Sequence, residues 1–167
     1  MKFRHELRYD APPGQVFEML ADPAFREAVA AAMDVISADV QLDRDGDRDV
    51  DGDGSGFTLV IDQQQNTKDL PGFARTFAGE STQAIQREVW AGPTGGDLSI
   101  ESPGKPASAS GTIRLEEEGS GTREVVELEI KVKVPLIGGK LEKLMAEKVA
   151  AGMDVEQTIG AAWLKEH

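Results

Sequence analysis

An acidic tract over residues 43–56 is the segment whose residue types come nearest to metal chemistry. Aspartates alternate there with glycines and arginines, and residues 49–54 (DVDGDG) match the first half of an EF-hand calcium loop. The twelfth position of such a loop requires a bidentate glutamate, but it falls on Val60, and the residues after it alternate like a strand. We therefore favour a solvated hairpin tip, with specific calcium binding or loose association of divalent cations as the alternatives.

The chain has two histidines, His5 and the last residue, His167. A histidine-based zinc or iron site is therefore not expected, and we predict neither a metal nor a cofactor. By strand alternation His5 points the same way as Phe3 and Leu7, toward the interior. It could act there as an acid, a base or a hydrogen-bond partner of a ligand. Alternatively, it is a structural histidine bonded to a neighbouring carbonyl or side chain.

Two further polar side chains, Gln63 and Arg87, fall in phase with apolar neighbours on predicted strands. Gln63 is in phase with Ile61, and Arg87 is in phase with Ile85 and Val89. We expect both to project into the concave side of a sheet. A buried guanidinium needs a partner, which a ligand carboxylate or phosphate could supply. A structural carboxylate, or a one-residue bulge that turns Arg87 outward, would explain the pattern equally well.

The composition disfavours several other kinds of chemistry. There is no cysteine, so disulfides, thiol nucleophiles and thiolate metal sites are excluded. No Gly-x-Ser-x-Gly motif is present, and the glycines at 52–56 and 92–96 lie in predicted hairpins, where a phosphate loop is not expected. The net charge of −12 opposes binding to nucleic acids and anionic lipid headgroups. Without an apparent signal peptide or membrane span, we expect a cytoplasmic protein with no integral membrane association.

Hydrophobic periodicity indicates the elements that would position these residues. Alternation of period two predicts seven strands, near residues 2–9, 35–42, 57–65, 81–90, 98–100, 107–118 and 122–134. Proline and Asp-Pro starts predict two short helices that end near residues 20 and 32, and 74–77 could form a helical turn. A long helix is predicted to close the chain. This order, a strand, two short helices, six strands and a long helix, indicates an α+β fold.

The long helix predicted over residues 140–164 has one apolar stripe and one weak point. The stripe consists of Leu141, Leu144, Met145, Val149, Val155, Ile159 and Trp163. Gly152 interrupts it, and a glycine within a helix costs about 1 kcal/mol relative to alanine. We therefore predict a kink or break at Gly152, with room for a ligand beneath the helix as the alternative. Lys148 and Glu156 intrude on the stripe, and we interpret them as side chains whose charged ends reach solvent.

Three landmarks carry a resemblance to a known superfamily. They are residues 9–12 (YDAP) after the first strand, Val16-Phe17 followed by Asp22-Pro23, and residues 134–139 (VPLIGG) before the long helix. With the element order, they resemble the START-like helix-grip (SRPBCC) superfamily of polyketide cyclases, lipid-transfer domains and plant ligand-binding proteins, within which an uncharacterised bacterial family is the nearest match.

The resemblance covers essentially the whole chain and implies a single domain over residues 1–167. It also implies a curved antiparallel seven-stranded sheet wrapped around a long C-terminal helix, two short helices after strand 1, and an apolar cavity between sheet and helix.

The favoured function is binding or carriage of a hydrophobic small molecule, lipid or polyketide-like, in that cavity. Apolar side chains would supply the wall: Phe57, Leu59, Ile61, Ile85, Val89, Leu128, Ile130, Met145 and Val149. His5, Gln63 and Arg87 would fix the polar part of the ligand, and no catalytic residue is predicted. The alternatives are a cyclase or hydratase that uses His5 and Arg87, and a protein-interaction module with a filled core. We expect a monomer or weak homodimer that does not bind nucleic acid.

Overall fold

The computed structural model describes residues 1–44 and 56–167. Within these ranges the chain forms seven strands and four helices: β1 (Lys2–Tyr9), α1 (Pro13–Leu20), α2 (Pro23–Ala32), β2 (Ser37–Arg44), β3 (Phe57–Asn66), α3 (Gly72–Ala78), β4 (Ser81–Gly92), β5 (Gly95–Glu101), β6 (Ala107–Glu118), β7 (Gly121–Val132) and α4 (Gly138–Glu166). Most of the acidic tract, and with it the hairpin-tip and calcium hypotheses, falls on residues 45–55, outside the described residues.

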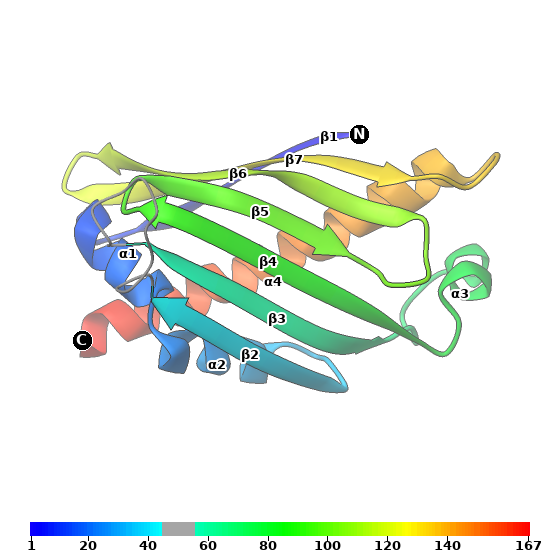
Figure 1. Ribbon diagram of the computed structural model, residues 1–167, viewed down its shortest axis with the longest axis horizontal. Helices are drawn as coiled ribbons and strands as arrows, with labels where there is room; N and C mark the ends of the chain where they lie inside the picture. The colour runs from blue at the N-terminus through cyan, green and yellow to red at the C-terminus, as the bar shows by residue number, and fades with distance from the viewer. Residues whose placement is uncertain (45–55) are drawn as a thin grey trace.

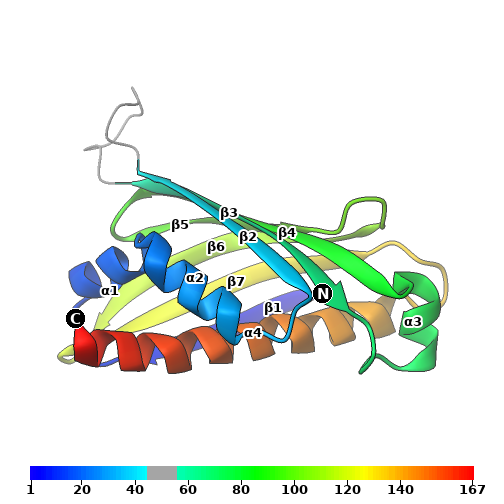
Figure 2. The same ribbon diagram turned by 90° about the horizontal axis from the view of Figure 1, so that it is seen from below.

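The seven strands form one antiparallel sheet in the order β1-β7-β6-β5-β4-β3-β2 (Figure 1). Strands β2 to β7 are consecutive neighbours, and β1 joins the sheet beside β7. The sheet curves over α4, and α1 and α2 lie on the same side of the sheet as α4 (Figure 2). The predicted α+β architecture, with its seven-stranded sheet and long C-terminal helix, is confirmed.

The two short helices begin where the sequence predicts. Pro13 and Pro23 occupy first-turn positions, where the missing N–H of proline leaves no helical hydrogen bond unmade. The Asp22 carboxylate caps α2 by accepting a hydrogen bond from the Ala24 N–H at 2.9 Å. This start places α2 between α4 and the β2 edge of the sheet (Figure 2).

Helix α4 runs unbroken through 29 residues, from Gly138 to Glu166, so the predicted break at Gly152 is wrong. Gly152 lies against the residue that follows α2, since a Cβ at this position would be 3.4 Å from the Met33 methyl carbon. Tertiary packing on β1, β7 and α2 holds the helix together across its weakest position. None of the helices in the described part of the chain is long and apolar enough to cross a membrane.

The space between the sheet and its helices is filled at one end by aromatic rings. Phe57 of β3 stacks on Trp90 of β4 at 5.4 Å between ring centroids. Phe17 of α1 packs on both rings, at 5.6 and 5.9 Å. All three side chains are buried. We call this the filled end of the concave face, the face of the sheet that turns toward α4.

Further along the same strands the concave face is only half-buried. Ile61 of β3, Gln86 of β4 and Ile100 of β5 are neighbours there, because Gln86 pairs with both of the others in the ladder. Gln63 follows Ile61 on the same face and is half-buried too. We call these four residues the half-buried end. Because buried apolar faces are normally covered completely in a packed core, partial exposure here indicates that side chains from α4 do not fully cover the sheet.

Candidate functional site

The predicted wall residues on β3, β7 and α4 share the concave side. Phe57, Leu59, Leu128 and Ile130 are buried in the core there. Four others are half-buried: Ile61 and Gln63 on the sheet, Met145 and Val149 on α4. Met145 and Val149 pack against the same core as Ile61 and Ile100. The structure therefore brings these residues to one side of the sheet, with the half-buried end opposite α4.

The predicted phase of β4 is wrong. The observed phase places three of the predicted wall and polar residues on the other face of the sheet. Ile85, Arg87 and Val89 point to the outer face, where Val89 is 51% exposed and Arg87 lies 3.7 Å from Glu101. The alternate residues of β4 face inward instead. The reason is Trp90, which lies near the end of the strand and is completely buried. Burying an indole removes more apolar surface from water than burying a valine, so Trp90 sets the face of the whole strand.

His5 lies on the concave side but at the edge of the sheet. Its Nε2 is 2.9 Å from Asp154 Oδ1 of α4, and its ring stacks on Phe3. The pair joins the edge strand β1 to α4. His5 is thus bonded to a neighbouring side chain, as the structural alternative predicted, and it lies on the opposite face of the sheet from Arg87.

A buried ion pair lies at the boundary between the filled end and the half-buried end. Arg26 of α2 donates to Glu88 Oε2 at 2.9 Å and to the Leu20 carbonyl at 2.7 Å. Trp90 Nε1 donates to the same Glu88 oxygen at 3.0 Å, and Gln86 Nε2 donates to the other at 2.9 Å. Both carboxylate oxygens of Glu88 thus accept hydrogen bonds from protein groups, as a buried charge requires.

Two more carboxyl groups reach the same ion pair from other elements. Glu156 of α4 places Oε1 3.8 Å from Arg26 Nη1, and its side chain is 14% exposed. Glu124 of β7 is 3% exposed, and Glu156, Glu88 and Arg26 all act on it electrostatically. All four charged groups also act electrostatically on the Tyr9 hydroxyl of β1. We call Arg26, Glu88, Glu124, Glu156 and Tyr9 the buried polar cluster.

Burial dominates the protonation of this cluster. It raises the pKa of Glu156 to about 7, with Arg26 opposing the shift and Glu88 adding to it. Burial also raises the pKa of Glu124 well above its usual range, and the carboxylates of Glu156 and Glu88 raise it further. For Arg26, burial alone would lower the pKa, but the surrounding carboxylates outweigh it and the guanidinium stays charged. The site therefore combines one fixed ion pair with two carboxyl groups that can hold or release protons.

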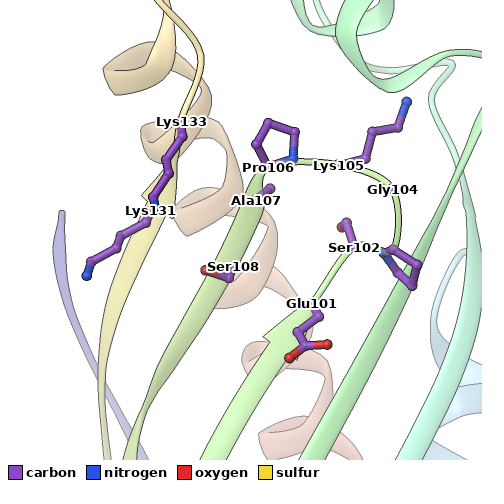
Figure 3. A pocket seen from close by; sticks show the side chains of 10 residues that line it. Glu101, Ser102, Gly104, Lys105, Pro106, Ala107, Ser108, Lys131 and Lys133 are labelled. Carbon is purple, nitrogen blue, oxygen red and sulfur yellow. The ribbon is translucent and has the colours of Figure 1, made fainter.

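Two hollows lie elsewhere, beside exposed residues of β5 to β7. One, of about 370 Å³, borders the β5–β6 turn and includes Lys105, Lys131 and Lys133; the side chains of Lys105 and Lys131 extend away from each other (Figure 3). The other, of about 600 Å³, borders Thr112 and Arg114. Among residues 1–44 and 56–167, no group of three or more His, Asp or Glu side chains is arranged to hold a metal ion.

Comparison with known proteins agrees with the whole-chain architecture. The family described as "Protein of unknown function (DUF2505)" matches residues 4–164. The chain belongs to this family. Uncharacterised proteins from Mycobacterium tuberculosis and Mycobacterium bovis are 26% identical to it over 112 residues, which are 64% of this chain and 64% of each relative.

Solved structures share the fold of this DUF2505 member. The di-domain ARO/CYC StfQ from the steffimycin biosynthetic pathway aligns with a TM-score of 0.65 at 11% identity, over 99% of this chain and 50% of StfQ. Norcoclaurine synthase from Thalictrum flavum gives 0.63 at 12% identity, over 100% of this chain and 87% of the synthase. A protein from Thermus thermophilus gives 0.61 at 21% identity, over 97% of this chain and 98% of that protein. At these identities the likeness concerns the fold alone.

Sequence reasoning missed the buried polar cluster of this DUF2505 member, although each residue gave a signal. Glu124 is in phase with the inward residues of β7, and Glu88 is in phase with Trp90. Arg26 lies one turn before the buried Val29. Glu156 intrudes on the apolar stripe of α4, but the interpretation that its charge reaches solvent is wrong, because it faces Arg26 instead. Four separate elements contribute the charges, so no local pattern could show that they meet.

Proposed function

We propose that the protein binds a hydrophobic small molecule between the half-buried end of the concave face and α4. One observation carries the proposal. Ile61 and Ile100 on the sheet and Met145 and Val149 on α4 are apolar, belong to one core and remain partly exposed to solvent. Apolar side chains that face each other across two elements gain free energy when a ligand removes their remaining surface from water, at about 25 cal/mol per Å².

The fold and the lining support a proposal for the ligand class. The superfamily that the sequence resembles includes polyketide cyclases and lipid-transfer domains, and solved structures of the same fold include a synthase and an ARO/CYC. A lipid or a polyketide-like compound is therefore the class we propose. Gln63 and Gln86 supply polar groups on the same face, and the buried polar cluster adjoins them through the bond between Gln86 and Glu88.

The enzymatic alternative does not survive in the form that the sequence suggested. It required His5 and Arg87 to face one cavity, but the two side chains lie on opposite faces of the sheet. His5 is also bonded to Asp154. We therefore propose binding or carriage as the function and do not assign a reaction.

The proposal can be tested with the neutral fluorescent probe N-phenyl-naphthylamine and two matched variants of α4. Val149→Phe adds bulk opposite the half-buried end, whereas Ala151→Phe adds the same ring on the exposed side of the helix. We expect the parent protein and Ala151→Phe to bind the probe with similar affinity. Val149→Phe should bind it roughly tenfold more weakly, because the added ring occupies the site.

Native mass spectrometry of protein that was purified without a refolding step provides a second readout. A bound species of a few hundred daltons, lost on denaturation, would identify the natural ligand class. If the parent protein carries no such species and does not bind the probe, the proposal is wrong and a protein-interaction module with a filled core is favoured. Equal probe binding by both phenylalanine variants would place the probe elsewhere and also contradict it.

A further inference from the structure

The buried polar cluster contains more negative than positive groups. Three carboxyl groups, from Glu88, Glu124 and Glu156, surround the guanidinium of Arg26. Arg26 and Glu88 form a close pair whose hydrogen bonds come from protein groups on both sides. The Nη1 to Oε1 distance of 3.8 Å leaves Glu156 too far from Arg26 for a hydrogen bond. Arg26 thus compensates Glu88 through a hydrogen bond and Glu156 only from 3.8 Å, and the Glu124 carboxyl has no ion-pair partner among the described residues.

Two buried atoms in the cluster lack a hydrogen-bond partner among the described residues. They are Glu124 Oε2 and the Tyr9 hydroxyl oxygen. Both side chains are more than nine-tenths buried. An unpaired buried polar group is costly, so such groups usually meet a partner from outside the protein chain. An ionised carboxylate can only accept hydrogen bonds, and the partner that Glu124 requires in that state is a donor.

The position of the cluster makes it reachable from the proposed ligand site. Gln86 belongs to the half-buried end and donates directly to Glu88 of the cluster. Glu156 keeps 14% of its side chain exposed and lies on the same helix as Met145 and Val149. Among the charged groups of the cluster, Glu156 is therefore the one that keeps the most exposed surface for contact with a ligand.

We infer that the ligand is an apolar molecule with a protonated amine at its inner end, and that the carboxylates of Glu156 and Glu124 bind this amine beside the Tyr9 hydroxyl. The inference rests on the proposed function, because it names the polar end of the same ligand. A protonated amine supplies both the missing positive charge and several N–H donors. A carboxylate or phosphate would meet two carboxylates, and the guanidinium that could attract it is already bonded to Glu88 and Leu20.

Amine binding should be linked to proton release. Glu156 is faced by Arg26 of α2, Glu88 of β4, Glu124 of β7 and Tyr9 of β1. Because burial raises the pKa of Glu156 to about 7, this group is largely protonated below that pH when no ligand amine is bound. A bound ammonium favours the ionised form and displaces the proton. The affinity for an amine should therefore rise as the pH rises through 7, while the affinity for a neutral molecule of the same length should not change.

The experiment compares three ligands that differ only at one end: dodecylamine, dodecanol and dodecanoate. Each displaces N-phenyl-naphthylamine from the parent protein, from Glu156→Gln and from Glu124→Gln. Glu147→Gln serves as the matched control, because it removes the same charge from an exposed position on α4. This control separates the cluster from the general attraction between an amine and an acidic protein.

Above pH 7 we expect the parent protein and Glu147→Gln to bind dodecylamine at least about tenfold more tightly than dodecanol, and dodecanoate least tightly. In Glu156→Gln and Glu124→Gln the preference for the amine over the alcohol should shrink several-fold, while dodecanol still binds. Retained dodecanol binding shows that both variants are folded. Calorimetry in two buffers of different ionisation heat should detect proton release on amine binding to the parent protein and to Glu147→Gln, and a smaller release in Glu156→Gln.

Failure of the inference and failure of the proposed function give different results. If the alcohol or the carboxylate binds as well as the amine, the site exists but the inferred amine recognition is wrong. An amine preference that persists in both glutamine variants also overturns it. If neither the three ligands nor the probe binds, the proposed function itself is wrong.

Discussion

Gly160 is the residue that allows Tyr9 to approach the buried polar cluster. A Cβ at this position of α4 would lie 2.6 Å from Cε1 of the Tyr9 ring and 3.2 Å from the Met19 methyl carbon. Gly160 itself is buried, one turn after Glu156. The absence of a side chain therefore lets the phenol ring pack directly against the helix, within the electrostatic reach of the carboxyl groups.

Replacement of Gly160 by alanine should destabilise the protein. The added methyl group would force the Tyr9 ring or the helix to move, and overpacking of this kind costs about 1–3 kcal/mol. Alanine recovers up to about 1 kcal/mol of helix propensity, so we expect a net loss of about 1–2 kcal/mol in the free energy of unfolding. Urea denaturation followed by circular dichroism measures it.

Gly152→Ala on the same helix provides the control. Its Cβ would meet only the flexible Met33 side chain, at 3.4 Å, which is an ordinary van der Waals distance. The variant should be as stable as the parent or up to about 1 kcal/mol more stable, because the propensity gain is not opposed. If both alanine variants are equally stable, close packing of Tyr9 on Gly160 is not important.

At the scale of elements, the ion pair between Arg26 and Glu88 connects α2 to the middle of the sheet. Arg26 is 2% exposed and Glu88 is 3% exposed. Removing one partner of a buried pair leaves the other charge uncompensated. Arg26→Met, which keeps the length and the apolar stem, should therefore lower the free energy of unfolding by about 3–5 kcal/mol at neutral pH.

Arg44→Met is the matched control, because Arg44 pairs with Glu18 at 3.2 Å on the surface, with side chains 45% and 64% exposed. Its loss should stay below about 1 kcal/mol. A comparable loss in both variants, measured by urea denaturation, would mean that the buried pair contributes no more than a surface one.

Elements with one polar and one apolar face could be predicted from the sequence, and elements with two apolar faces could not. In β7 glutamates and lysines alternate with Val126, Leu128 and Ile130, and the observed face is the predicted one. In β4 the alternation predicts that Ile85, Arg87 and Val89 face inward, whereas the structure buries the alternate set with Trp90. Only the assembled core decides between such sets, because the decision depends on which side chains the other strands and helices can surround.

The buried charged residues could not be predicted from the sequence for a related reason. A charged residue is normally exposed, so a sequence interpretation places Glu156 and Arg26 at the surface unless a partner is known. The partner of each lies on another element, far away along the chain. Fold and wall residues with clear periodicity were thus accessible to sequence reasoning, whereas the cluster became visible only through tertiary structure.

At the scale of the whole molecule, the two ends of the concave face differ in how completely they are packed. Phe17, Phe57 and Trp90 make the filled end a conventional core, which stabilises the sheet and the first helices. The half-buried end gains less stabilisation from burial. The buried polar cluster, which lies between the two ends, lowers the stability because burying charged groups costs free energy. Binding sites often retain such locally unfavourable groups, because a ligand supplies the missing contacts.

The cluster should also make the stability of the whole protein depend on pH. The folded-state pKa of Glu156 is about 7, above the ordinary value of 4.5 that the unfolded chain would show. Between these values the folded state holds a proton that the unfolded state releases, so the stability must fall as the pH rises from about 4.5 to about 7. A shift of this size corresponds to about 3 kcal/mol of folding free energy. The raised pKa of Glu124 acts in the same direction.

Glu156→Gln tests this dependence, because glutamine cannot ionise and resembles the protonated acid. Urea denaturation across this pH range should give a clearly shallower fall in stability for the variant than for the parent, with a residual slope from Glu124. Surface carboxyls do not obscure the comparison. The pKa values of Glu6, Glu116 and Glu127 are lowered by hydrogen bonds from arginines, so their contribution is lost only as the pH falls below about 4.5. Identical slopes in both proteins would show that burial in the cluster does not raise the pKa of Glu156 above that of the unfolded chain.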